Sequence, residues 1–129
     1  MTALLRACLL APEYSTLRYR AAWLAFAVIV IGGAIPGARA EMGNVAPGVV
    51  LHASAYATIT FLLLTGSRGS LPARAAKAVL TVAIMGAVDE GIQTLLPYRR
   101  GAVMDWMVDV TAALTCAAVC CILMRPRRL

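Results

Sequence analysis

Four long apolar runs constrain the fold of this chain more than any other feature of its sequence. They span residues 21–38, 45–65, 77–96 and 103–124. A helix rises about 1.5 Å per residue, so about 20 apolar residues cross the hydrocarbon core of a bilayer. Short stretches rich in Gly, Pro and Arg separate the runs. The sequence therefore predicts an all-α protein, a single domain of residues 1–129 built as a bundle of four transmembrane helices, in which residues 1–20 form a cytoplasmic or interfacial segment.

The overall composition also indicates a membrane protein. Hydrophobic residues make up 61% of the chain and charged residues only 14%, whereas about a quarter of the residues in a soluble domain are charged. The net charge is +6, but the basic residues fall in short clusters between the apolar runs. This distribution suits anionic lipid headgroups. We therefore expect membrane lipids as partners and no nucleic acid.

The same basic residues predict the orientation of the bundle. Nine of the twelve Lys and Arg residues lie before the first run, around the loop between the second and third runs, or after the fourth run. The other three are Arg39, Arg99 and Arg100. Because Lys and Arg in short loops stay in the cytoplasm, both termini are expected to be cytoplasmic.

A second interpretation of the first apolar run stays open. Arg20, the apolar stretch that follows it, and the Ala38-x-Ala40 sequence before Glu41 resemble a secretory signal peptide and its cleavage site. However, the segment before this run is long, and it contains a second apolar patch, ALLRACLLAP. These two features favour an uncleaved transmembrane helix, and whether residues 1–40 are processed is left open.

Polar residues on three of the apolar runs are expected at one depth in the membrane. In the predicted orientation they all lie in the outer leaflet: His52 and Tyr56 on the second run, Asp89, Glu90 and Gln93 on the third, and Asp105 and Asp109 on the fourth. Pairs spaced by four residues share a helix face. An ionised side chain that faces lipid costs about 2.5 to 3.5 kcal/mol at the bilayer centre. The sequence therefore predicts a polar pocket open to the outside, with Arg99 or Arg100 as counter-charge.

Within this pocket the residue types indicate possible roles. Glu90 is the candidate acid or base, with its charge balanced by Arg99. His52 is a candidate proton relay, and Asp105 is a candidate for orienting it or the substrate. The candidate substrate-binding residues are Tyr56, Asp89, Gln93, Arg99 and Asp109.

Small residues in the apolar runs are expected at contacts between helices. Gly33 and Gly91 are examples, because a glycine lets two helix backbones approach. Cys116, Cys120 and Cys121 are interpreted as small packing residues too, since a lone Cys-x-x-x-Cys-Cys does not supply convergent metal ligands. The sequence contains no nucleophile elbow, phosphate loop or metal motif. It therefore predicts no metal and no cofactor, and it leaves open whether the protein is an enzyme.

The polar residues resemble those of the VanZ-like family of small membrane proteins, which is named for a member linked to teicoplanin resistance. The family carries Asp-Glu-x-x-Gln, then Pro-x-Arg, then an Asp followed four residues later by an Asn. The matching residues here are Asp89, Glu90, Gln93, Pro97, Arg99 and Asp105. The second helix of the family carries Asp-Lys-x-x-His-x-x-x-Tyr, of which His52 and Tyr56 match. This chain departs from the pattern at Gly48 and Val49, which replace the Asp-Lys pair, and at Asp109, which replaces the Asn.

The resemblance implies a multi-pass protein of the bacterial inner (cytoplasmic) membrane. It also implies that the pocket binds or modifies an envelope lipid headgroup, a cell-wall precursor or a glycopeptide. Two other functions stay open. One is a small four-helix transporter, although the acids gather at one face and not at the midplane. The other is a non-catalytic accessory or scaffold subunit, which the loss of the Asp-Lys pair at Gly48 and Val49 would fit. The sequence leaves the oligomeric state open.

Overall fold

The structure is an all-helical bundle, as predicted. The computed structural model describes residues 10–125 of the chain. Its long helices are α2 (Ser15–Ala34), α4 (Gly48–Gly66), α5 (Leu71–Thr94) and α6 (Val103–Met124), and its short elements are the 3-10 helix η1 (Pro12–Tyr14) and α3 (Ala38–Gly43). Each of the four long helices is long and apolar enough to cross a membrane. The chain is thus a multi-pass membrane protein.

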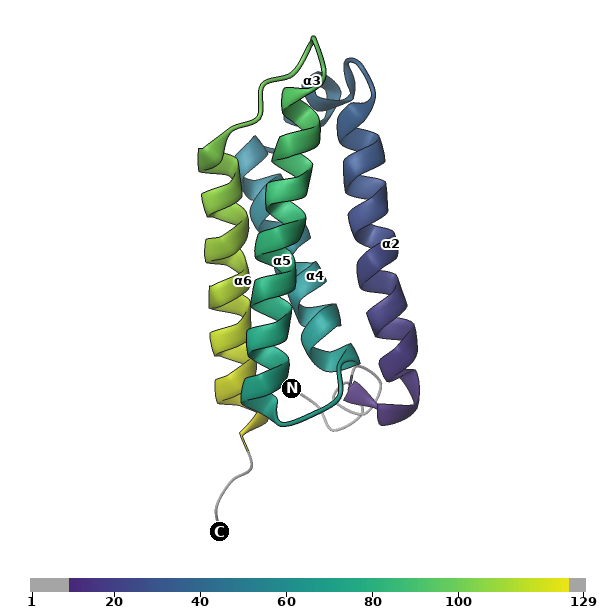
Figure 1. Ribbon diagram of the computed structural model, residues 1–129, viewed down its shortest axis with the longest axis vertical. Helices are drawn as coiled ribbons and strands as arrows, with labels where there is room; N and C mark the ends of the chain where they lie inside the picture. The colour runs from purple at the N-terminus through teal and green to yellow at the C-terminus, as the bar shows by residue number, and fades with distance from the viewer. Residues whose placement is uncertain (1–9, 126–129) are drawn as a thin grey trace.

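The long helices run alternately up and down, which gathers the loops at two ends of the bundle (Figure 1). One end holds α3 and the loop between α5 and α6, residues 95–102, and we call it the polar end. The opposite end holds the loop between α4 and α5, residues 67–70, and we call it the basic end. In the interior, α4 and α5 both pack against α6, while α2 packs mainly against α4.

Helix α2 lies further toward the N-terminus than its apolar run predicts. It begins at Ser15 instead of residue 21 and ends at Ala34 instead of residue 38. Its end is explained by Pro36, because a proline disfavours the helical backbone conformation of the residue before it, and Ile35 is accordingly extended, with ψ at 124°. Gly37 then turns the chain with a positive φ of 83°, and the separate helix α3 begins at Ala38, the last residue of the predicted run.

Prolines also set the beginnings of α4 and α5. Helix α4 begins at Gly48 instead of residue 45, directly after Pro47. Helix α5 begins at Leu71 instead of residue 77, with Pro72 in its first turn. A proline is well tolerated there because the first N–H groups of a helix have no partner within the helix. For α6 the predicted range of 103–124 is the observed one.

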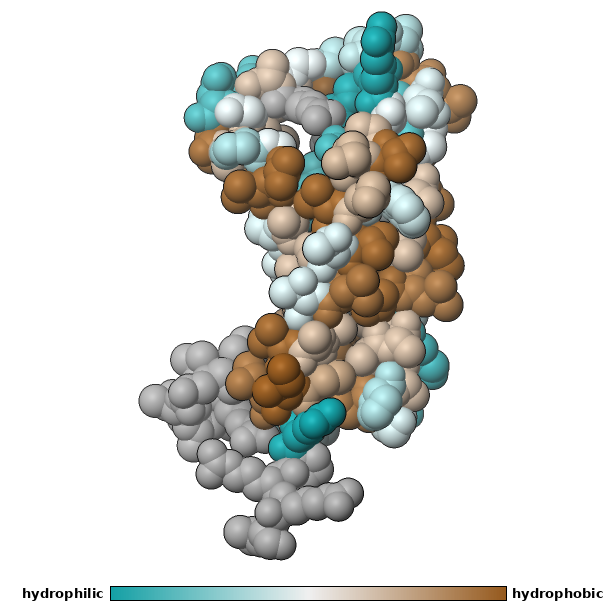
Figure 2. All heavy atoms as spheres, turned by 90° about the vertical axis from the view of Figure 1, so that its left-hand side faces the viewer, coloured by the Kyte–Doolittle hydropathy of each residue, from teal (hydrophilic) through white to brown (hydrophobic). Residues whose placement is uncertain are grey.

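The surface of the bundle matches a bilayer environment. Large apolar side chains are exposed along α2, α5 and α6, among them Leu24, Val28, Leu80, Ile84 and Ile122, and in the first turn of α4. On the face shown in Figure 2, hydrophobic residues run along the middle of the molecule and the most hydrophilic residues lie toward its ends. The interior is apolar as well, with Ile59, Leu64, Val82 and Ala113 fully buried. An exposed apolar belt is expected where lipid is the solvent.

Gly66 brings α2 and α4 into backbone contact at the basic end. A Cβ atom at Gly66 would lie 2.6 Å from the backbone nitrogen of Tyr19 and 2.8 Å from the carbonyl oxygen of Ser15. The glycines expected at helix contacts from the sequence behave differently, because a Cβ at Gly33 or Gly91 would have no neighbour within 4 Å. That expectation was therefore wrong for Gly33 and Gly91, and close packing occurs at Gly66 instead.

Hydrogen bonds fix α2 at both of its ends. At the basic end Arg18 donates from Nη2 to the carbonyl oxygen of Thr65 at 3.0 Å and from Nη1 to that of Ala11 at 3.1 Å. At the polar end the Tyr98 hydroxyl donates to the carbonyl oxygen of Ala34 at 2.5 Å. The loop between α5 and α6 is thereby tied to the end of α2.

Candidate functional site

A polar cluster lies between α4, α5 and α6 near the polar end. Five of its side chains are buried, each at most 8% exposed: Tyr56, Asp89, Glu90, Gln93 and Asp109. The side chain of His52 is 16% exposed. The three helices therefore bring together the residues that the sequence placed at one depth.

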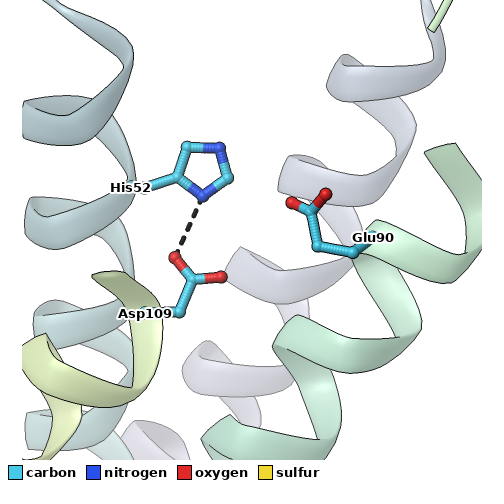
Figure 3. A group of neighbouring side chains, drawn as sticks. All are labelled: His52, Glu90 and Asp109. Carbon is cyan, nitrogen blue, oxygen red and sulfur yellow. Dashed lines mark hydrogen bonds and ion pairs between the residues drawn. The ribbon is translucent and has the colours of Figure 1, made fainter. Parts of the chain in front are cut away.

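His52 and Asp109 form the central contact of this cluster. Nδ1 of His52 lies 2.9 Å from Oδ1 of Asp109, and Figure 3 shows the two side chains facing each other from α4 and α6. The contact engages Nδ1 and leaves Nε2 as the ring nitrogen for a ligand. An imidazole oriented by a buried carboxylate is an arrangement suited to acid–base chemistry.

Tyr56 and Asp89 form a second buried contact beside the first. The Tyr56 hydroxyl donates to Oδ2 of Asp89 at 3.2 Å, and both side chains are at most 2% exposed. The rings of Tyr56 and His52 stack with their centroids 6.1 Å apart. Tyr56 thus contacts both Asp89 on α5 and His52 on α4.

The expected ion pair between Glu90 and Arg99 is not formed. Arg99 donates from Nη2 to Oε1 of Gln93, one turn away from Glu90. Glu90 instead accepts a hydrogen bond through Oε2 from the backbone N–H of Ala102, at 2.6 Å. Ala102 precedes the first residue of α6, so the carboxylate lies at the positive end of that helix dipole.

Asp105 lies at the edge of the cluster, half-buried in the first turn of α6. The sequence made it the candidate for orienting His52 or the substrate. The residue that orients His52 is nevertheless Asp109, which the sequence analysis had placed among the substrate-binding residues. Asp105 is one helical turn closer to the polar end.

A cavity of about 260 Å³ adjoins the cluster on its α2 side. Its polar wall consists of His52, Tyr56, Asp89, Gln93 and Arg99. The rest of its lining is apolar or small: Val28, Ile29, Gly32, Gly33, Met42, Gly48, Leu51 and Ala55. Five of the eight predicted site residues therefore face this cavity, while Glu90, Asp105 and Asp109 are not among its described lining residues.

Two residues that position the site were missed by the sequence analysis. Trp106 donates from Nε1 to the carbonyl oxygen of Ala83 at 2.9 Å, which joins α6 to α5. A Cβ at Gly86 would lie 3.0 Å from Oδ2 of Asp109 and 3.1 Å from Cδ1 of Trp106. The spacing of Gly86 four residues before Glu90 was a usable signal for a close approach on that face. The apolar wall of the cavity could not be predicted from a comparable signal, because its residues are of the types that also face lipid.

Comparison with known proteins leaves the class of this protein to be defined by its own fold and site. No protein-family model, curated protein or solved structure matches the chain. The fold defines a four-helix, multi-pass membrane protein. The site adds a buried cluster of one histidine and several carboxylates near one end of the bundle, next to a cavity.

Proposed function

We propose that this protein binds or modifies the polar headgroup of an envelope lipid, a cell-wall precursor or a glycopeptide. The cavity between α2 and the polar cluster is the observation that carries the proposal. The resemblance to the VanZ-like family agrees with it and implies the cytoplasmic membrane of a bacterium as the location.

The two walls of the cavity match the two parts of an amphipathic ligand. Val28, Ile29 and Leu51 offer apolar surface, whereas His52 and Arg99 offer polar groups on the opposite wall. Pockets that enclose a drug-sized ligand measure about 300 to 1,000 Å³, and this one is about 260 Å³. It therefore suits a headgroup whose acyl or prenyl chains stay outside in the membrane.

Arg99 favours an anionic headgroup. Its Nη2 is held by Gln93, while its Nε is buried and has no hydrogen-bond partner. A guanidinium in this state can bind a phosphate or carboxylate through its remaining N–H groups. His52 lies on the same wall and offers Nε2 as a second polar contact.

The cluster also favours a working site over a purely structural network. Oε1 of Glu90 and Oδ2 of Asp109 are buried without a hydrogen-bond partner, whereas buried polar groups that serve only structure are nearly always satisfied. The described lining of the cavity contains no Ser, Thr or Cys. A reaction there would therefore have to activate water or a hydroxyl of the substrate instead of a Ser, Thr or Cys nucleophile.

A cavity-filling variant tests the proposal. Gly33 lines the cavity and has open space beyond it, so Gly33→Leu should fold and occupy the cavity. The matched control is Gly91→Leu, at an exposed helical glycine with equally open surroundings and outside the cavity lining. Native mass spectrometry of protein extracted from bacterial membranes should show bound lipid in the wild type and the control, and its loss in Gly33→Leu.

A second pair of variants tests the charge preference. Arg99→Gln should reduce the binding of anionic lipid by about tenfold or more, as expected for the loss of a charge-assisted contact of about 1.5 to 3 kcal/mol. Arg100→Gln removes an equal charge from an exposed neighbour and should bind as the wild type does. Unchanged lipid binding in both Gly33→Leu and Arg99→Gln would refute the proposal.

A further inference from the structure

We propose that His52, Glu90 and Asp109 form a binding site for a divalent transition-metal ion. This site goes beyond the proposed headgroup binding and does not depend on it. The three residues come from α4, α5 and α6, and one potential ligand atom from each lies within 4.8 Å of the other two. Figure 3 shows the three side chains converging on a common space.

The free oxygens of the two carboxylates point to a cation as the ligand. Oε1 of Glu90 and Oδ2 of Asp109 are buried and have no hydrogen-bond partner. Glu90 as a whole is 8% exposed and Asp109 is 0% exposed. One carboxylate oxygen of each residue is directed into the space between the three side chains (Figure 3). A buried carboxylate oxygen without a partner is unfavourable because it has lost its contact with water, and a bound cation would satisfy both oxygens.

The charge balance leads to the same conclusion. Within the described part of the chain, neither Glu90 nor Asp109 forms an ion pair with a lysine or arginine, and His52 is the one basic partner of Asp109. Two carboxylates at this separation repel each other strongly inside a protein. A divalent cation between them would neutralise both charges at once.

The ligand types indicate which ions fit. One imidazole nitrogen and two carboxylate oxygens suit Mn²⁺, Fe²⁺ or Zn²⁺ better than Mg²⁺ or Ca²⁺, which prefer oxygen ligands alone. Metal–ligand distances of about 2.0 to 2.2 Å place two ligands of one ion at most about 4.4 Å apart. The three atoms lie within 4.8 Å of one another and would draw closer on binding an ion. The hydrogen bond from Ala102 to Glu90 would orient the ligating carboxylate, as outer partners commonly do.

Electron paramagnetic resonance with Mn²⁺ tests the site directly. The protein is purified in a neutral detergent, stripped with a chelator and titrated with manganese chloride. Mn²⁺ is the suitable probe because the thiols of Cys116, Cys120 and Cys121 on α6 prefer softer ions. We expect one bound Mn²⁺ per chain, with electron spin-echo modulation from an imidazole nitrogen. An absence of nitrogen modulation in the wild-type protein would overturn the proposal without the need for any variant.

Isosteric variants identify the ligands. Asp109→Asn and Glu90→Gln each keep an oxygen that can accept the existing hydrogen bond from His52 or Ala102, so both should fold. Each should weaken Mn²⁺ binding at least about tenfold, and His52→Gln should abolish the nitrogen modulation. Glu41→Gln, which neutralises an exposed acid of α3, is the control and should bind Mn²⁺ as the wild type does. Unchanged affinity in both Asp109→Asn and Glu90→Gln would rule the site out.

Discussion

Asp109 presents two oxygens in different situations. Oδ1 contacts Nδ1 of His52 at 2.9 Å, whereas Oδ2 has no partner, and the side chain is completely buried. In the VanZ-like pattern that the sequence resembles, an asparagine takes the place of Asp109. An asparagine offers the same acceptor toward the histidine. The fold therefore needs only an acceptor at this position, whereas the proposed metal site needs a carboxylate.

We therefore expect Asp109→Asn and Asp109→Leu to differ in stability. The asparagine keeps an acceptor for His52 and should lower the free energy of unfolding by less than about 1 kcal/mol, near the net value of one hydrogen bond. The leucine removes the acceptor and should cost roughly 1 to 3 kcal/mol for the unpartnered histidine nitrogen. Thermal unfolding in detergent, followed by tryptophan fluorescence, distinguishes the two. Equal destabilisation by both substitutions would show that the charge itself holds the fold.

The sequence could predict which residues share this site but not which of them touch. Asp105 and Asp109 are four residues apart and lie on one face of α6, so periodicity treats them as equivalent. The rotation of α6 about its own axis decides between them, and the contacts of Gly86 and Trp106 fix that rotation. Arg99 is a similar case, because its choice of Gln93 over Glu90 depends on the path of the loop.

At the level of whole helices, glycines have two opposite effects on packing. Gly66 removes a side chain so that α4 can touch the backbone of α2. Gly33 on α2 removes a side chain where α2 faces the cavity, and so leaves the space open. Glycine thus allows a close helix contact at Gly66 and leaves space beside the cavity at Gly33.

Alanine substitutions separate these effects. Gly66→Ala should lower the free energy of unfolding by about 1 to 3 kcal/mol, as overpacking does, because the atoms that a Cβ would meet are backbone atoms that cannot rotate away. Gly33→Ala should be neutral or stabilising by up to about 1 kcal/mol, since alanine has the higher helix propensity. Denaturant titration of both variants in the same detergent measures the difference. A similar effect of the two substitutions would contradict the close contact of α4 with α2 at Gly66.

Hydropathy predicted the existence of the four long helices, and their ends needed other information. The run at 103–124 has no proline within it and became α6 as predicted. The start of α5 at Leu71 was missed because Arg74 precedes the apolar run that begins at residue 77. Basic residues with long apolar stems are nevertheless compatible with a helix that extends to the membrane surface. The short helix α3 follows from the turn at Pro36 and Gly37, which a hydropathy window averages away.

Across the whole molecule the charges of the two ends differ. Six of the nine basic residues behind the predicted orientation are described, and they lie at or toward the basic end: Arg18, Arg20, Arg68, Arg74, Lys77 and Arg125. A hollow of about 360 Å³ there is lined partly by Arg68 and Lys77. The acids of the cluster lie near the other end. Arg6, Arg127 and Arg128, which entered the orientation argument, lie outside the described residues. The asymmetry favours a cytoplasmic basic end.

Reporter fusions test this orientation. A reporter fused after Leu129 should indicate a cytoplasmic position, and one inserted at Arg100 should indicate an external position. The reason is that lysine and arginine near helix ends are retained on the cytoplasmic side. An alkaline phosphatase and a green fluorescent protein fusion at each position give opposite readouts. The reverse pattern would place the cavity on the cytoplasmic side and exclude ligands confined to the outer leaflet.

The buried bond between Tyr56 and Asp89 also constrains how this protein can evolve. The two residues lie on different helices, 33 positions apart, and neither is in contact with bulk solvent. A lineage that replaced Tyr56 with phenylalanine would carry a buried carboxylate that had lost its donor. A lineage that first replaced Asp89 with leucine would strand the hydroxyl. Either single step passes through a less stable ancestor, so the two positions are expected to be inherited as a pair and to covary among descendants.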